Sequence, residues 1–284
     1  MNTKLLFIIL FVAYTALIIP FSTFMKQRPV AVKLGYTPEA RVIRLVAPEY
    51  RQMFAQSSVV RVLFYYGTLL DEFTNRVKLQ PEYFNMFRTL QIAVKLDPYN
   101  MDAYYFAQSA FTWELKKIRE VNDLLNYGME YRTWDGQLPF YAGFNCAYFL
   151  KDFASAAKYF QEAARRSHEP LYANLAARYF YESGSTELGL AFLKNMVQSA
   201  KEEKIKKVYQ VRITALAQVR ELERALAKYI SSKGVAPGTI DDLAHQGFIS
   251  SIPRDPYGGT YYLETNGRIA TTSKFAFADS GIKK

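Results

Sequence analysis

Residues whose side chains could carry out catalysis or hold a metal are few in this 284-residue sequence, and they do not gather into a motif. The only histidines, His168 and His245, lie far apart, and neither belongs to a metal-spaced or triad-like cluster. The single cysteine, Cys146, excludes an intramolecular disulfide and a cysteine-based zinc cluster. Inside an expected helix, it is typical of a buried, inert thiol.

The carboxylates and glycines add no catalytic pattern. Asp241 and Asp242 are adjacent, so they would point apart on a helix, which favours capping over acid–base catalysis. The glycine-containing stretches GVAPG and YGG lack the strand-to-helix context of a phosphate-binding loop, and no serine stands in a nucleophile elbow. We therefore expect a protein that is not an enzyme and uses no cofactor.

The charge of the chain points to an anionic neighbour. There are 36 lysines and arginines against 26 acidic residues, a net charge of +10, which suits a membrane surface, an acidic protein or nucleic acid. Nucleic-acid binding would need aromatic residues between the basic ones of residues 201–233, and only Tyr209 and Tyr229 occur there. The sequence therefore argues against a nucleic-acid partner.

A trio of small, large and small residues recurs along the middle of the chain. In residues 151–165, Ala156, Phe160 and Ala163 are four and three apart, so they share one helical face that can approach another helix closely. The period is roughly the 34 residues of a helical-hairpin repeat. The other instances are Met86, Leu90 and Ala93; Val121, Leu125 and Gly128; and Gly189, Leu193 and Met196.

This recurrence, with the phrase AVKLDPYN closing the first copy, resembles the tetratricopeptide repeat (TPR) over about residues 79–197. The sequence departs from that family where Gln108 and Phe144 replace glycine, and an unrelated helical bundle remains the alternative. The resemblance implies an all-α, TPR-like α-solenoid, with repeats over 69–200 and hairpins at about 69–96, 102–131, 138–165 and 170–200.

In that family, the inner wall of first helices holds an extended peptide. The wall positions that the resemblance implies are partner-binding residues Tyr105, Ser109, Tyr141, Asn145, Tyr148, Asn174, Arg178 and Tyr181. Of the basic clamp that grips a terminal carboxylate, only Asn145, Asn174 and Arg178 qualify, so an aromatic wall suited to apolar or aromatic segments is expected instead. The alternative is that these tyrosines only pack between hairpins.

The amino-terminal run LLFIILFVAYTALIIPF predicts a transmembrane signal anchor within residues 1–25, because it is uncharged and no small-x-small cleavage site follows. The basic residues after it favour a cytoplasmic body, whereas the short, positively charged amino terminus favours export. Residues 26–68 are expected to form a membrane-proximal helical segment that caps the repeats with Val59, Val60 and Leu63.

After the repeats, residues 201–233 predict a long basic amphipathic helix, with apolar residues three and four apart. Residues 234–284 predict a short helix and a β-hairpin around Thr265, Asn266 and Gly267. Over about residues 225–273, the order of a long helix, a short helix, the run IPRDPYGG and strands resembles the carboxyl-terminal half of the major pseudopilin of type II secretion, which implies export. Asp255 is the only carboxylate that matches a pseudopilin calcium site, and one is too few.

Together these patterns predict an all-α solenoid behind one membrane helix, with a small carboxyl-terminal α/β cap. The functional hypothesis is a scaffold in the inner membrane of a bacterium, with a periplasmic body that binds another envelope protein in a secretion or pilus-like assembly. The alternative is an accessory subunit of polysaccharide or lipid machinery, acting on anionic lipid through Lys204, Lys206 and Lys207. The sequence leaves the oligomeric state open.

Overall fold

The computed structural model describes residues 3–27, 33–70, 82–167 and 169–275. The chain divides into two compact units, Met1–Asp97 (unit 1) and Pro98–Lys284 (unit 2). Both consist mainly of helices, and the second also contains a small antiparallel hairpin. The expected helical fold with a small carboxyl-terminal hairpin is therefore confirmed.

Unit 1 contains α1 (Thr3–Gln27), α2 (Ala40–Val46), η1 (Pro48–Tyr50), α3 (Arg51–Leu70) and α4 (Tyr83–Leu96). Helix α3 packs against α4, and α2 also contacts α4. The core includes Val59 and Val62 of α3 and the trio Met86, Leu90 and Ala93 of α4. The first helix pair therefore begins within the segment expected to be a separate cap. Its connection, residues 71–81, lies outside the described residues.

The described side chains of α1 are those of Leu6, Phe7 and residues 9–23, and the large apolar ones are exposed. A membrane-spanning helix needs about 20 consecutive apolar residues. Within the described residues, no helix combines the length and the apolar character needed to cross a membrane. The expected transmembrane helix is thus not supported by these residues and stays a prediction.

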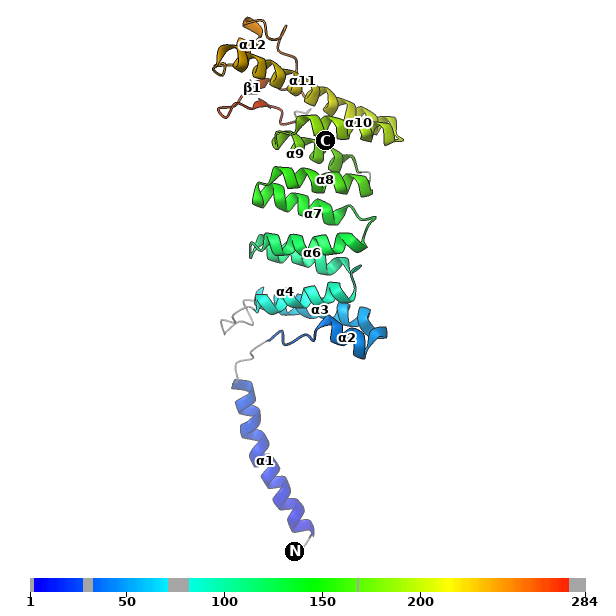
Figure 1. The fold of residues 1–284 in the computed structure, drawn as a ribbon. Helices are drawn as coiled ribbons and strands as arrows, with labels where there is room; N and C mark the ends of the chain where they lie inside the picture. The colour runs from blue at the N-terminus through cyan, green and yellow to red at the C-terminus, as the bar shows by residue number, and fades with distance from the viewer. Residues whose placement is uncertain (1–2, 28–32, 71–81, 168, 276–284) are drawn as a thin grey trace, which may run out of the picture. The chain divides into compact units, whose positions relative to one another are not determined.

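Unit 2 begins with stacked antiparallel helices (Figure 1). Helix α5 (Met101–Phe106) continues into η2 (Ala107–Thr112), and α7 (Gln137–Asn145) continues into η3 (Cys146–Leu150). Each helix packs on the next in the chain. The remaining helices of the stack are α6 (Ile118–Tyr131), α8 (Phe153–Ser167), α9 (Pro170–Glu182), α10 (Thr186–Ser199) and α11 (Glu203–Lys233).

The recurring trios lie where these helices meet. All nine of their residues in unit 2 are buried: Val121, Leu125, Gly128, Ala156, Phe160, Ala163, Gly189, Leu193 and Met196. Gly128 shows why small residues are needed, because a Cβ there would lie 2.6 Å from Cζ of Tyr104 and 2.7 Å from Cδ1 of Leu138. The trios therefore act as the close-contact points that their spacing predicts.

The first helices of two hairpins, α5–η2 and α7–η3, end in a way that the sequence pattern does not predict. Both η2 and η3 are π-helical, and a lysine in the left-handed region follows each, Lys116 and Lys151, both with φ of 55°. Each end is closed by a backbone hydrogen bond spanning six residues, from Lys117 to Phe111 (2.9 Å) and from Asp152 to Cys146 (3.0 Å). The left-handed region costs strain for lysine, and π-turns are frequent at functional sites.

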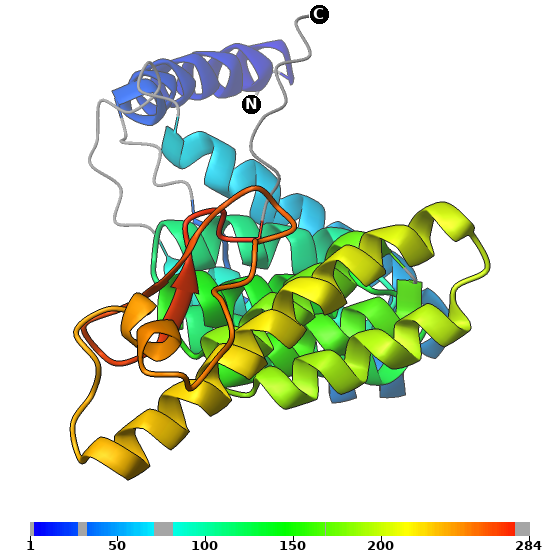
Figure 2. The same ribbon diagram turned by 90° about the horizontal axis from the view of Figure 1, so that it is seen from above.

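Residues 234–275, called the tail from here on, form α12 (Asp241–His245) and strands β1 (Tyr261–Leu263) and β2 (Ile269–Thr271). The strands pair antiparallel with Tyr262 opposite Ala270, as the hairpin prediction requires. The tail lies along α11 (Figure 2) and buries Leu243 and Tyr261 in a core shared with Leu222. Ile230 of α11 is not part of that core and is 40% exposed.

Candidate functional site

The first helices of unit 2 stack in register, so equivalent residues lie side by side. Tyr105 of α5 and Tyr141 of α7 have ring centroids 6.5 Å apart. One turn further, the side-chain amides of Gln108 and Asn145 exchange two hydrogen bonds of 2.8 Å. Residues 36 or 37 positions apart in the sequence therefore form one continuous face.

A partly exposed aromatic surface covers this face, and it consists of Tyr105, Trp113, Tyr141, Phe144, Tyr148 and Phe149. Trp113 contacts Tyr148 (5.6 Å between centroids) and, edge-on, Phe149 (4.9 Å), and Phe144 stacks on Tyr148 (5.4 Å, 11°). Tyr105, Trp113 and Tyr148 nevertheless keep 59%, 46% and 53% of their surface exposed. Large aromatic side chains held this way offer contact area at low entropic cost.

The two left-handed lysines lie at the edge of the aromatic surface. Nζ of Lys116 is 5.0 Å from the ring centroid of Phe149, and Nζ of Lys151 is 5.3 Å from that of Tyr148. Such contacts hold a cation beside the aromatic face. Neither lysine forms an ion pair with a carboxylate of the described residues, so both can still meet an acidic group.

Asn145 lies beneath the aromatic surface rather than on it. It is fully buried, and its Nδ2 donates to Oε1 of Gln108 and to Oδ1 of Asn122, both at 2.8 Å. Asn122 in turn donates to Sγ of Cys146 at 3.6 Å, and burial raises the pKa of that thiol to about 11. This network joins α5–η2, α6 and α7–η3. Ser109, by contrast, is exposed and donates to the carbonyl of Phe106 (3.1 Å).

On α9, the position that matches Tyr148 is Tyr181, and the chain's own tail already covers it. Tyr181 is only 3% exposed, and its hydroxyl donates to the carbonyl oxygen of Ile269 in β2. Phe275 meets its ring edge-on at 5.0 Å, and the guanidinium of Arg268 lies 5.2 Å from the ring centroid. Burial raises the pKa of the Tyr181 hydroxyl, consistent with a group removed from water. Tyr181 therefore holds the tail.

Of the other two predicted residues on α9, Arg178 and Asn174, the structure places Arg178 close to the same contact. Arg178 lines a cavity of about 240 Å³ together with Tyr181, Arg268 and Phe275, and its Nε is 4.0 Å from Oε1 of Glu182. Among the described residues, Nε of Arg178 and Oδ1 of Asn174 have no hydrogen-bond partner although both atoms are buried. Arg268, which the sequence did not single out, pairs with Glu182 and with Glu264 (3.0 Å).

Two further buried charges fix the tail, and sequence reasoning gave them no such role. The guanidinium of Arg212 on α11 lies 4.9 Å from the ring centroid of Tyr257 and donates to the carbonyl of Phe275 (2.8 Å). Burial lowers the pKa of Arg212. Asp255 accepts hydrogen bonds from the amide of Tyr257 (2.9 Å) and the hydroxyl of Ser273 (2.5 Å). Its carboxylate is thus a structural acceptor, and the described residues contain no cluster of three or more metal-ligating side chains.

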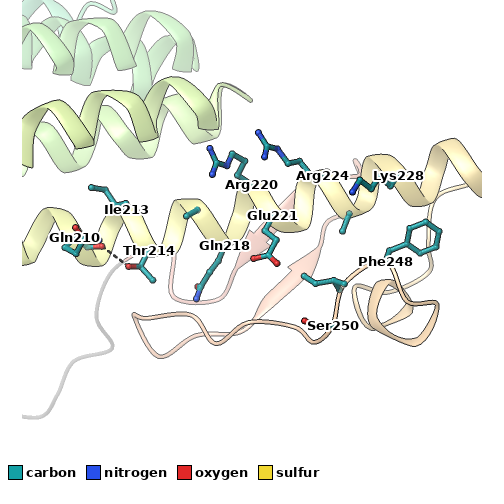
Figure 3. A pocket seen from close by; sticks show the side chains of 13 residues that line it. Gln210, Ile213, Thr214, Gln218, Arg220, Glu221, Arg224, Lys228, Phe248 and Ser250 are labelled. Atoms are coloured by element: carbon teal, nitrogen blue, oxygen red, sulfur yellow. Dashed lines mark hydrogen bonds between the residues drawn. The ribbon is translucent and has the colours of Figure 1, made fainter.

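A second groove, of about 760 Å³, runs along α11 beside residues 248–250 of the tail (Figure 3). Arg220 and Arg224 lie on one side of the helix and Gln218 and Glu221 on the other. Arg224 is engaged by Glu187 at 2.7 Å. This mixed, polar lining does not bring together groups that would act on one ligand.

Compared with models of protein families, with curated proteins and with solved structures, the chain gives no match. The resemblances to the tetratricopeptide repeat and to the pseudopilin therefore stay predictions.

Proposed function

We propose that this protein is a membrane-anchored scaffold whose TPR-like helices hold an extended segment of another protein on the aromatic surface. The observation that carries the proposal is the exposure of Trp113 and Tyr148 beside Lys116 and Lys151. On the neighbouring helix α9, Tyr181 stands at the position that matches Tyr148 and holds an extended segment of the tail. Exposed aromatic side chains that cluster with cations are typical of binding surfaces.

The tail supports the proposal because it is an example of what such a face can hold. Strand β2 meets α9 through one tyrosine hydroxyl and one backbone carbonyl, with an aromatic side chain, Phe275, placed edge-on to the tyrosine. Tyr148, 33 residues earlier, keeps more than half of its surface accessible. An extended segment of a partner could accept a hydrogen bond from the Tyr148 hydroxyl and place an aromatic side chain against the Tyr148 ring in the same manner.

The cellular context of the proposal rests on sequence features. The apolar helix α1 would serve as the anchor in a bacterial inner membrane, and the pseudopilin-like tail favours a periplasmic body in a secretion or pilus-like assembly. The alternative, a lipid-directed accessory subunit acting through Lys204, Lys206 and Lys207, has less support, because Lys206 is paired with Glu203 at 2.7 Å.

Selection from a random-peptide library tests the proposal. The full chain in detergent is the bait, and Trp113→Ala and Tyr148→Ala are the variants, with Leu188→Ala as the control at an exposed site on α10. Peptides selected by the unaltered chain should bind the first two variants at least about tenfold more weakly, because exposed aromatic anchors carry much of an interface's affinity. Equal binding to all three variants would refute the proposed site.

A further inference from the structure

Helix α2 leaves most of its apolar side chains uncovered. It buries only Ala40 and Ile43, whereas Val42, Leu45 and Val46 are 52%, 85% and 77% exposed. The exposed run continues along the chain through Tyr50 (56%) and Met53 (59%). These five residues, Val42, Leu45, Val46, Tyr50 and Met53, are called the unit 1 apolar segment. A soluble surface rarely gathers so much exposed apolar area without a partner.

Basic residues without carboxylate partners are interspersed with this segment. Lys33, Arg41 and Arg51 are exposed and form no ion pair among the described residues. The acidic residues nearby are Glu39, which pairs with Arg88 and is thereby neutralised, and the exposed Glu49. The local balance is thus three available cations against one available carboxylate.

The other two arginines of this region are engaged within unit 1. Arg44 donates to the carbonyl of Lys95, and Arg61 donates to the hydroxyl of Thr37. These hydrogen bonds hold α2 and α3 on unit 1, so the unit 1 apolar segment belongs to a folded part of the chain. Exposed aliphatic and aromatic side chains alternating with cations suit the boundary between anionic headgroups and acyl chains.

The chain also restricts how far the apolar segment can be from α1. Between Gln27 and Ala40 there are 13 residue steps, which span at most about 45 Å even when fully extended. If α1 is the membrane anchor of the proposed function, the segment is confined to a layer close to the bilayer. This step rests on that anchor, whereas the exposure and charge of the segment do not.

We propose that the unit 1 apolar segment lies in the interface of an anionic membrane, with Val42, Leu45 and Val46 among the acyl chains and Arg41 and Arg51 at the lipid phosphates. The body of the scaffold would then be held at the membrane surface at two points, α1 and α2. A partner protein covering the same residues is the competing occupant, and the experiment separates the two.

An environment-sensitive fluorophore on a cysteine at position 45 tests this contact. Cys146 is buried, so the Leu45→Cys chain should label at the new site, with the unaltered chain carried through labelling as the control. The labelled full chain is reconstituted in vesicles of phosphatidylcholine alone or mixed with phosphatidylglycerol. We expect a blue shift and a rise in emission in the anionic vesicles, and none for the same label at Leu188→Cys, an exposed leucine on α10.

The cations should control this signal. Arg41→Gln with Arg51→Gln should lower the equilibrium constant of the lipid contact about 25-fold, since each cation near an anionic surface contributes roughly a fivefold attraction, and added salt should act in the same direction. No shift at position 45 in anionic vesicles overturns the inference. A shift that appears without lipid and grows with protein concentration also overturns it, in favour of a protein partner.

Flotation of the same labelled chain distinguishes this inference from the proposed function. Chains that float with both neutral and anionic vesicles but show no shift at position 45 in the anionic ones retain the anchor and lack only the surface contact. Chains that do not float with any vesicle contradict both the anchor and the inference that rests on it.

Discussion

Helix α9 and the pair α5–η2 and α7–η3 present similar faces, but the chain covers only one of them. On α9, Tyr181 is buried under β2 and Phe275, whereas Tyr148, at the matching position on η3, is more than half exposed. Both tyrosines lie among aromatic neighbours and near cations. The difference shows that the residue type alone does not determine whether such a tyrosine is buried or exposed. What decides it is whether a segment distant in the sequence covers the side chain.

The largest expected effect comes from truncating each of these two tyrosines. Tyr181→Ala should lower the free energy of unfolding by about 3–5 kcal/mol, because it removes a buried ring and leaves a cavity. Tyr148→Ala should change it by less than about 0.5 kcal/mol, as is usual at exposed sites. Urea unfolding followed by circular dichroism measures both. Similar losses for the two variants would mean that the aromatic surface is part of the folded core.

Asp255 extends the comparison to the interior of the tail. Asp255→Ala leaves the hydroxyls of Thr271 and Ser273 and the amide of Tyr257 without their acceptor, which should cost about 1–3 kcal/mol or more. Limited proteolysis should then cleave the tail sooner than the repeats. Asp241→Ala, at an exposed residue of α12, serves as the control and should leave the cleavage rate unchanged.

Asn145 and Ser109 provide a similar contrast beneath and on the aromatic surface. Asn145→Ala should destabilise the protein by about 1–3 kcal/mol, because Gln108 and Asn122 lose buried hydrogen-bond partners. Ser109→Ala should have little effect on unfolding, since among the described residues its hydroxyl bonds only to the carbonyl of Phe106 in its own helix. If thermal unfolding shows no loss for Asn145→Ala, the buried network does not hold these helices together.

Alkaline pH should weaken the region around Cys146 by a predictable amount. Burial raises the pKa of this thiol from 9.0 to about 11, so the thiol contributes its full stabilisation below pH 9. Between pH 9 and 11 the thiol ionises in the unfolded chain but not in the folded one, so stability falls as pH rises. At pH 10 the loss relative to Cys146→Ala should be about 1.4 kcal/mol. Urea titrations of both chains at pH 7 and 10 measure this difference, and parallel stabilities would contradict it.

The smallest effect isolates a single hydroxyl at each tyrosine. Tyr181→Phe removes the donor to Ile269 and should cost about 1 kcal/mol, with the carbonyl left in a dry contact. Tyr148→Phe should be neutral for unfolding. A neutral result for Tyr181→Phe would mean that ring packing alone holds the tail on α9.

The local features of the fold could be predicted from the sequence because short-range spacing determines them. The trio Ala156, Phe160 and Ala163 is buried as its spacing of four and three requires, and the hairpin forms around Gly267, whose φ of 82° suits glycine. The long helix after the repeats is likewise present as α11. Each of these follows from residues within one or two turns of one another.

The remaining features depend on contacts between distant residues. Nothing near Tyr181 in the sequence indicates that the carbonyl oxygen of Ile269, 88 residues later, will accept a hydrogen bond from its hydroxyl. Asn145, the last residue of α7, is buried and Tyr148 in the π-helical end η3 is exposed, whereas a regular helical register assigned both to the same open wall. The net positive charge of the sequence likewise did not reveal that Lys116 and Lys151 lie against aromatic rings.

Site-specific photocrosslinking tests most directly whether the aromatic surface holds another protein. Benzoylphenylalanine replaces Tyr105 or Tyr148 in the full chain expressed in its own cells, with position 188 on α10 as the matched exposed control. We expect positions 105 and 148 to crosslink to neighbouring residues of one segment in a second protein, and position 188 not to do so. Crosslinks from 105 and 148 only to lipid or to this chain's own tail, or an identical partner from position 188, would contradict it.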